Sequence, residues 1–330
     1  MYFENMRTTR ANFKLVLRKC RADNDRIMSD KLATNLLHRD SKAFWNNVKN
    51  VSSCSIRTQA TTIEGTTGKE NICSMWRRYF QDLLNSSKDT SKKDEVLKEL
   101  SIQDNCLHGI FTPGDVMKSV SKLKLGKSAG LDSLSSEHFK YASHSIHVHL
   151  SIIFNSMLLH GTVPDTLMDS LIVTLLKDKK GDVTDKDNYR PIAITCVSSK
   201  VLELLLLEKF SCYLDTGNHQ FGFKSGHSTD QCVFVLKEVI NYFASKSSPV
   251  YTCFVDASKA FDRVNHWGLL SKLLKRHVPK IVVRLFMVWF TTQKFYVKWD
   301  NVISSPFTVS NGVRQGGILS PLFLMYLLRI

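Results

Sequence analysis

The 330-residue sequence lacks the patterns of several protein classes. None of its eight cysteines forms a Cys-x-x-Cys pair and no histidine pair follows at zinc-finger spacing, so a structural zinc site is not indicated. No long apolar stretch is free of charged residues, so we predict no membrane-spanning helix. The first residues, MYFENMRTTRANFK, lack the apolar centre of a secretory signal. These absences, and the lack of internal repeats, are typical of a reduced, intracellular, non-repetitive protein.

The composition favours a folded chain. Hydrophobic residues make up 43% of the sequence, which is ordinary for a globular protein. The length predicts about two structural units. Cys196, Cys232 and Cys253 lie in apolar runs, and we predict that they are buried thiols.

The charge is strongly unbalanced. The formal net charge is +15 and the isoelectric point is about 9.4. A polyanion is therefore an expected partner, because a protein that neutralises phosphates releases their condensed counterions. Charge alone is equally compatible with a basic protein that has no nucleic-acid role.

Residues 1–104 are predicted to be a basic helical region with polar linkers. The first fifty residues carry eleven Lys or Arg against five Asp or Glu, a net +6. Asp40 or Ser41 is suited to cap a second helix. A solvated basic hairpin and an RNA-contacting surface both fit this pattern. Apolar residues at helical spacing in the first helix are Phe13, Val16, Leu17 and Cys20; those expected in the second are Phe44, Trp45 and Val48.

Residues 105–330 are predicted to be a separate domain of the α+β class, because strands and helices do not alternate regularly. Thr112 and Pro113 are typical of a helix start, with Asp115 three residues after the cap. Strands are expected at 171–176, 189–195 and 250–255, with a hairpin about Asp300-Asn301; helices are expected at 147–159, 201–213 and 267–274.

The run CFVDASKAFD places Asp256 at the end of the apolar run 250–255. A carboxylate delivered by a buried strand is costly unless it is paired or binds a metal. Two-metal phosphoryl transfer needs such carboxylates on rigid strands. Taken alone, Asp256 is equally suited to close a turn or cap a helix, and Asp262 is suited to cap the next helix.

Two further segments carry candidate chemistry. In NGVRQGGILSP, glycines permit close approach of a substrate, and Gln315 offers a donor and acceptors; alone, this is also a plain turn before a helix. In LLKDKKGD and NYRPI, two strands flank a basic loop. There, Arg190 is suited to bidentate binding of a triphosphate and Lys177 to add a point charge, whereas Lys179 and Lys180 fit a solvated hairpin tip.

Taken together, five segments in this order resemble the reverse transcriptases of non-LTR (LINE-type, jockey-like) retrotransposons. They are KLGKSAGLD, LLKDKKGD with NYRPIAI, HQFGFKSGHSTD, FVDASKAFDRVNH and NGVRQGGILSP. The resemblance covers the chain from about residue 105, and more weakly the basic helices before it. It implies an RNA-directed DNA polymerase shaped as a right hand, with fingers and an incomplete palm.

The resemblance also implies roles for particular residues. Asp256 would be the catalytic, metal-binding carboxylate, and the carbonyl of Ala257 would help a second metal; the expected cofactor is two Mg²⁺ ions, or Mn²⁺ in their place. The expected partners are an RNA template, a DNA primer and dNTPs, and nuclear action is implied. The dNTP pocket would be formed by Lys177, Arg190, Ala257, Phe261 as the steric gate, Gln315 and Gly316; the template would contact Gln220, Gly222 and Phe223.

The sequence departs from the family pattern at one motif, and this departure leaves three interpretations open. The family follows the Gln-Gly loop with an aromatic-x-Asp-Asp turn, and no Asp-Asp dipeptide occurs in these 330 residues. The thumb is expected to be absent too. The first interpretation is a truncated polymerase that is inactive alone. The second is a non-catalytic, RNA-binding remnant of a decayed element, and the third is an interaction protein with neither activity.

Overall fold

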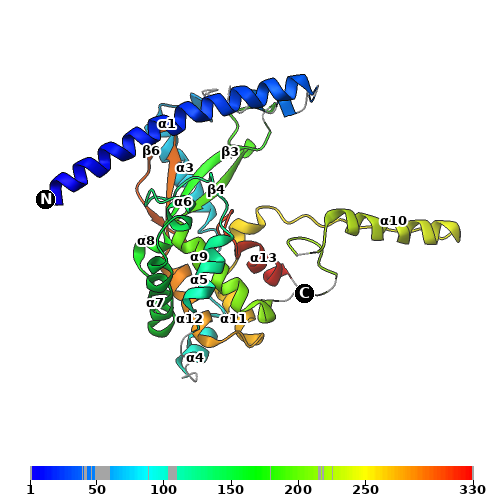
Figure 1. Ribbon diagram of the computed structural model, residues 1–330. Coiled ribbons are helices and arrows are strands. Elements are labelled where there is room, and N and C mark those ends of the chain that lie inside the picture. Colours follow the sequence, from blue (N-terminus) through cyan, green and yellow to red (C-terminus); the bar gives the residue numbers. More distant parts are fainter. Residues whose placement is uncertain are drawn as a thin grey trace. The chain divides into compact units, whose positions relative to one another are not determined.

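The computed structural model describes residues 2–38, 40, 43–45, 47–48, 60–87, 89–102, 110–178, 180–214, 217, 219–224 and 226–328 (Figure 1). The chain forms two compact units, residues 1–59 and 60–330. The hairpin-tip Lys179 lies outside the described residues. None of the described helices is both long and apolar enough to cross a membrane.

The first unit contains the long helix α1 (Tyr2–Leu37), which confirms the helical prediction for this region. Its apolar residues do not pack within the unit, since Phe13 is 65% exposed. Of the two predicted caps, Asp40 is confirmed, because its Oδ1 accepts a hydrogen bond from the backbone N–H of Ala43 at 2.9 Å. Ser41 lies outside the described residues.

The second unit contains a mixed sheet. Its strand order is β4-β3-β5-β6, and β7 also pairs with β5. β3 runs antiparallel to β4 and parallel to β5, so both strands predicted between residues 170 and 195 are confirmed. The predicted hairpin is also confirmed, since Trp299 pairs with Val302 and Asp300 has φ +55° in the turn. The strands are β3 (Ser170–Leu176), β4 (Tyr189–Thr195), β5 (Lys294–Trp299), β6 (Val302–Ile303) and β7 (Phe307–Thr308), with a separate pair, β1 (Thr62–Ile63) and β2 (Thr66–Thr67).

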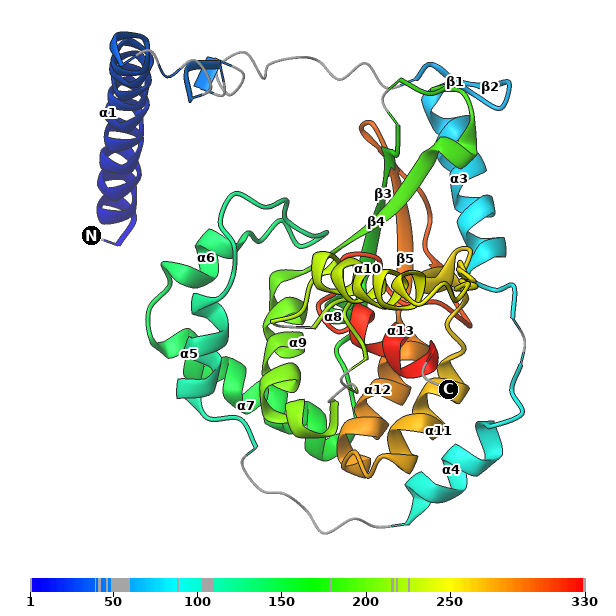
Figure 2. The same ribbon diagram turned by 90° about the vertical axis from the view of Figure 1, so that its right-hand side faces the viewer.

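Helix α3 (Lys69–Leu83) packs against this sheet beside β5 (Figure 2). Trp76 is fully buried, and its ring stacks on Phe80 with centroids 5.4 Å apart. It also meets Tyr189 of β4 edge-on at 5.3 Å and lies 6.2 Å from Trp299 of β5. Such aromatic contacts stabilise beyond the area they bury. The aromatic cluster therefore joins α3 to the sheet.

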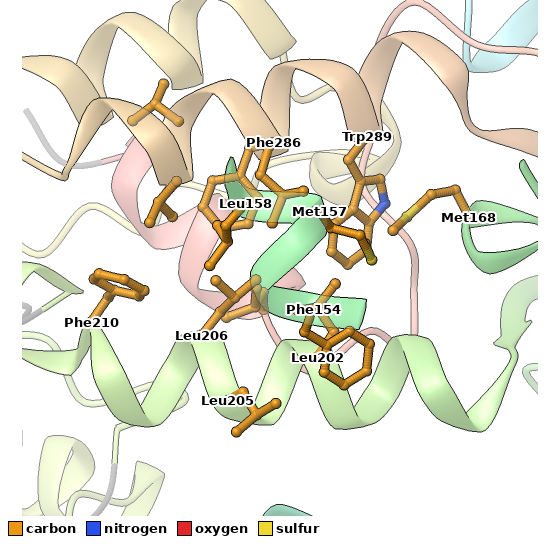
Figure 3. Close-up of a cluster of buried hydrophobic side chains, with 14 of the residues drawn as sticks. Phe154, Met157, Leu158, Met168, Leu202, Leu205, Leu206, Phe210, Phe286 and Trp289 are labelled. Carbon is orange, nitrogen blue, oxygen red and sulfur yellow. The ribbon is translucent and has the colours of Figure 1, made fainter. Parts of the chain in front are cut away.

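Most of the other helices of the second unit, but not α10, share a larger core (Figure 3). Phe154, Leu158, Leu202, Leu206 and Phe286 meet at its centre from three helices. The helices of this unit are α4 (Lys93–Ser101), α5 (Pro113–Ser121), α6 (Ser136–Lys140), α7 (Ser145–His160), α8 (Asp165–Met168), α9 (Val197–Lys209), α10 (Thr229–Ser245), α11 (His266–Lys275), α12 (Lys280–Thr292) and α13 (Ser320–Leu328), with short 3₁₀ turns η1 (Lys186–Asn188), η2 (Ser211–Leu214) and η3 (Ala260–Arg263).

The predicted start of α5 is confirmed in atomic detail. The Thr112 hydroxyl accepts from the Asp115 N–H at 3.2 Å, and the Asp115 carboxylate accepts from the Thr112 N–H at 2.9 Å. This is a reciprocal capping box with Pro113 at the first helical position. Both partners satisfy backbone donors that a helix start leaves free.

The strand predicted at 250–255 is wrong. The segment has no regular secondary structure, and Tyr251 and Val255 are 92% and 93% exposed. The physical reason is that a strand needs a neighbour for its backbone groups, and no strand in the described part of the chain pairs with this one. The predicted burial of Cys232 and Cys253 is also wrong, since both thiols are exposed. Cys196 is buried, as predicted.

Residues 60–102 pack with the residues that follow them. The compact unit begins at Ala60, and α3 and α4 contribute to its two cores. Our boundary at residue 105 stays a prediction about where the polymerase domain begins, but any domain cut there would lose the Trp76 cluster.

We therefore predict that Trp76→Ala destabilises the second unit by about 3–5 kcal/mol, because it removes a fully buried ring and leaves a cavity. Urea unfolding followed by fluorescence of the remaining tryptophans measures this. Tyr141→Ala, at a side chain that is 75% exposed, is the control and should change stability by no more than about 0.5 kcal/mol. Equal effects of the two substitutions would contradict the packing of α3.

Candidate functional site

The loop 311–317 is anchored by backbone hydrogen bonds to the segment 261–264. The Val313 N–H donates to the Phe261 carbonyl and the Gly312 N–H donates to the Val264 carbonyl, both at 2.8 Å. Gly312 has φ +88°, a conformation that other residues adopt only under strain. Two segments that the sequence separates by about fifty residues are thereby held side by side.

The same loop is tied to α3 and to β4. The Asn311 N–H donates to the Leu84 carbonyl at 3.0 Å, at the end of α3. The Ala193 N–H of β4 donates to the Gln315 carbonyl at 2.8 Å. At Gly316, where φ is +109°, a Cβ atom would lie 3.2 Å from the Ala193 carbonyl oxygen. A glycine is needed there because the loop passes close to the strand.

Two buried charged residues, Arg314 and Glu203, hold the loop 311–317 and the residues after it against the helical core. The Arg314 guanidinium donates to the Met168 carbonyl at 2.5 Å and lies 4.7 Å from the centre of the Trp289 ring. The Glu203 carboxylate accepts from the Leu319 N–H at 3.0 Å, next to the start of α13. Burial raises the pKa of Glu203, and the Arg314 charge opposes that rise. The loop therefore has a polar support inside the helical core.

Asp262 contacts Gln315 directly. The Gln315 Nε2 group donates to both carboxylate oxygens, at 3.0 and 3.2 Å. Asp262 is only 6% exposed, and burial raises its pKa, whereas the Gln315 hydrogen bond and the charges of Lys259 and Lys177 lower it. The expectation that Asp262 caps the next helix is wrong, because Asn265 does so by accepting from the Gly268 N–H at 2.8 Å.

The structure also brings Phe261 together with Phe223. Their rings meet edge to face with centroids 6.3 Å apart. Phe261 is partly buried against the helical core, whereas Phe223 is 67% exposed with φ +56°. Gln220 donates through Nε2 to the Gly222 carbonyl at 3.1 Å in the same turn. The expected template motif thus lies against the expected steric gate.

A side chain of α3 reaches this region. The Lys259 Nζ group donates to the Tyr79 hydroxyl at 2.9 Å, and this hydrogen bond raises the pKa of Lys259. Lys259 itself has φ +53° within the DASKAF run. Helix α3 therefore contacts the chemistry-bearing segments, although sequence reasoning assigned it no role.

The expected triphosphate-binding residues lie on the β3–β4 hairpin. Lys177 follows β3, and its Nζ group donates to the Asp187 carbonyl at 2.5 Å. Its positive charge lowers the pKa of Asp262, against the larger rise that burial causes. Arg190 lies on β4 opposite Leu175, and its side chain is exposed. Arg190 is thus accessible to solvent.

Asp256 and Ala257 are not brought into this cluster. Both are exposed in the segment that forms no strand. Within the described ranges, no group of three or more His, Cys, Asp or Glu side chains is placed to hold a metal ion. The expected metal site is therefore not assembled by the residues that the structure describes.

Sequence reasoning missed Asp262, Tyr79 and Glu203 as site residues. The role of Asp262 depends on Gln315, fifty-three residues away, so it has no local signature. Tyr79 precedes every recognisable motif. Glu203 lies in the apolar helix run VLELLLLEK, and a lone acidic residue among leucines was the one available signal.

Part of the chain matches a known protein family. Residues 177–329 match the model of the family described as reverse transcriptase (RNA-dependent DNA polymerase). The match includes β4 and the anchored loop, whereas β3 and Tyr79 lie before it.

Similar curated proteins come from mobile elements. The RNA-directed DNA polymerase from mobile element jockey of Drosophila funebris is 32% identical over 214 residues, which are 63% of this chain. The probable RNA-directed DNA polymerase from transposon BS of Drosophila melanogaster is 30% identical over 213 residues, also 63% of the chain. The aligned residues cover 23% of the length of each of these relatives.

His266 provides a pH test of the loop anchoring. Its Nε2 atom is 2.7 Å from the Gly312 carbonyl oxygen, and its ring stacks on Phe290 at 4.5 Å. Burial lowers the pKa of His266 to about 4. The unfolded chain therefore takes up a proton below about pH 6.5 that the folded chain excludes, so the free energy of unfolding falls between pH 6.5 and 4.

We expect the His266 contribution to this loss to be about 3 kcal/mol, fully developed below pH 4 and absent above pH 6.5. Urea unfolding of the wild type and His266→Gln at several pH values measures it, because the difference between the two removes the shared carboxylate titrations. Parallel pH profiles for the two proteins would show that His266 is not buried against the loop.

Proposed function

We propose that this chain is the nucleotide- and template-binding part of an RNA-directed DNA polymerase of a non-LTR retrotransposon. The whole polymerase would transfer a nucleotide from a dNTP to a primer 3′-hydroxyl. The observation that carries the proposal is the loop 311–317, which backbone hydrogen bonds join to Phe261 on one side and to β4 on the other. In this proposal the second unit corresponds to fingers and a partial palm, and residues 105–330 are the polymerase domain.

The anchored loop supports a nucleotide pocket. Gln315 and Gly316 line it, and the Phe261 ring limits the space beside the sugar, so a ribose 2′-hydroxyl is excluded by its size. Arg190 and Lys177 supply positive charge for the triphosphate, for which a planar guanidinium is the better shaped group. Phe223, exposed and in contact with Phe261, offers a ring on which a template base can stack.

The described residues do not fit two Mg²⁺ ions. Asp256 and Ala257 are exposed, and the structure places no cluster of three acidic, His or Cys side chains within the described residues. What this part of the chain does is bind and orient the nucleotide and the template, with RNA template, DNA primer and dNTPs as partners and the nucleus as the place of action.

A second candidate function is RNA binding without catalysis, as a remnant of a decayed element. The net charge of +15 and the exposed position of Asp256 favour it. The two candidate functions predict different nucleotide binding. The polymerase should select deoxynucleotides, whereas a non-catalytic remnant should not.

We predict that the 330-residue chain binds dATP more tightly than ATP, which differs only by the 2′-hydroxyl. Phe261→Ala should lose this preference by raising the affinity for ATP, because the ring no longer occupies the space of that group. Competition against a fluorescent dATP analogue measures both affinities, and Tyr141→Ala is the control at an exposed ring. A wild type that binds neither nucleotide, or both equally, supports the remnant.

We also predict that the chain alone binds single-stranded RNA but does not extend a primer. Its affinity for RNA should fall steeply with salt, because each neutralised phosphate contributes a slope of roughly −0.7 in a log–log plot. Fluorescence anisotropy between about 50 and 200 mM salt gives the slope. Mg²⁺-dependent primer extension that Asp256→Ala abolishes would contradict the prediction of inactivity.

A further inference from the structure

Three buried polar side chains each have one atom that no group among the described residues pairs with. They are Glu203 on α9, Arg314 in the loop 311–317 and Gln293 at the end of α12, and none of them is more than 4% exposed. The unpaired atoms are Oε1 of Glu203, Nε of Arg314 and Nε2 of Gln293. A buried polar atom without a hydrogen bond destabilises the fold, so these three atoms together require an explanation.

Other hydrogen bonds fix the positions of two of these side chains. Oε2 of Glu203 accepts from the Leu319 N–H at 3.0 Å. Nη1 of Arg314 donates to the Ser199 hydroxyl at 3.2 Å. Turning either unpaired atom toward a different protein group would break these bonds. The unpaired atoms therefore stay where they are, and a ligand must come to them.

The three side chains line the same small cavity. Its volume is about 10 Å³, the space that the centre of one water molecule needs. The apolar part of the lining includes Trp289, Phe290 and Phe323, each at most 5% exposed. The cavity is therefore internal, and its ligand must be a single small molecule.

The polar atoms around the cavity define the chemistry of this ligand. Arg314 Nε and Gln293 Nε2 are donors, whereas the Glu203 carboxylate only accepts. The ligand must therefore accept two hydrogen bonds and donate one. A halide ion cannot donate to Glu203, and a metal or ammonium ion cannot accept from the other two. Water can do both, and a buried water typically makes about three hydrogen bonds.

We propose that this cavity binds one ordered water molecule, which accepts hydrogen bonds from Arg314 Nε and Gln293 Nε2 and donates one to Glu203 Oε1. Within the described part of the chain, Glu203 and Arg314 make no direct hydrogen bond with each other, so the water joins two buried opposite charges. It also links the end of α12 to the loop 311–317. The water site does not depend on the proposed function, because only the folded second unit is needed to form it.

A crystal structure of the 330-residue chain tests the site directly. The wild type should show one electron-density peak within about 2.7–3.2 Å of all three atoms. Gln293→Met, which keeps the length of the side chain but has no amide, should lack the peak. Gln81→Met, at a glutamine of α3 outside the cavity, should keep it. A wild type with no peak there, or with Arg314 and Glu203 in direct contact, overturns the proposal.

Oxygen-17 relaxation dispersion tests the same site in solution, because it counts waters that stay buried in a protein. The wild type and Gln81→Met should each hold one such water more than Gln293→Met. Circular dichroism confirms that each variant is folded. Equal counts in folded Gln293→Met and wild type overturn the proposal. If Gln293→Met does not fold, the electron density of the wild type decides.

A double-mutant cycle tests whether the water couples these side chains. In Glu203→Gln the remaining oxygen is needed by the Leu319 N–H, so an amide donor faces the cavity and the water loses its acceptor. Gln293→Met removes a donor to the same water. The double variant should therefore unfold about five-fold less readily than the product of the two single effects predicts.

Gln81→Met combined with Glu203→Gln is the control pair, and its effects should multiply to within about two-fold. Urea unfolding of the single and double variants gives the equilibrium constants for both cycles. Effects that multiply equally well in the two cycles would show that no water connects Gln293 to Glu203.

Discussion

The loop 311–317 is shaped by hydrogen bonds from elsewhere in the chain. A short loop with two left-handed glycines has no regular structure of its own, so its conformation must be imposed from outside. Here the end of α3, the segment 261–264 and β4 each contribute backbone hydrogen bonds, and Glu203 holds the residues that follow. Because these contacts come from separate parts of the sequence, the loop reaches its working shape only when both cores of the second unit have formed.

Helix α3 contributes to the shape of this loop, although no motif in its sequence indicates such a role. The family match begins at residue 177, yet α3 packs its aromatic residues on the sheet, anchors the loop through Leu84 and reaches Lys259 through Tyr79. Helix α3 therefore helps to hold the loop 311–317 and Lys259 in place. The part of the chain needed for the proposed nucleotide binding is therefore longer than the family motifs alone indicate.

Local patterns predicted local structure well. The capping box of α5, the strands β3 and β4 and the hairpin at Asp300 depend on residues within a few positions of one another, and the structure confirms them. The strand expected at 250–255 failed because an apolar run becomes a strand only when a neighbouring strand accepts its hydrogen bonds. The contact between Asp262 and Gln315 could not be predicted for a similar reason, because these residues lie far apart in the sequence.

The central claim is that the loop 311–317 and β4 form one wall of a nucleotide pocket. Photo-crosslinking of the 330-residue chain with a dATP analogue that carries an aryl azide on its triphosphate, followed by peptide mapping, tests it most directly. The account predicts labelling that falls on the β3–β4 hairpin and the loop, and that excess dATP prevents. Labelling confined to α1 or α10, or undiminished by dATP, would contradict it.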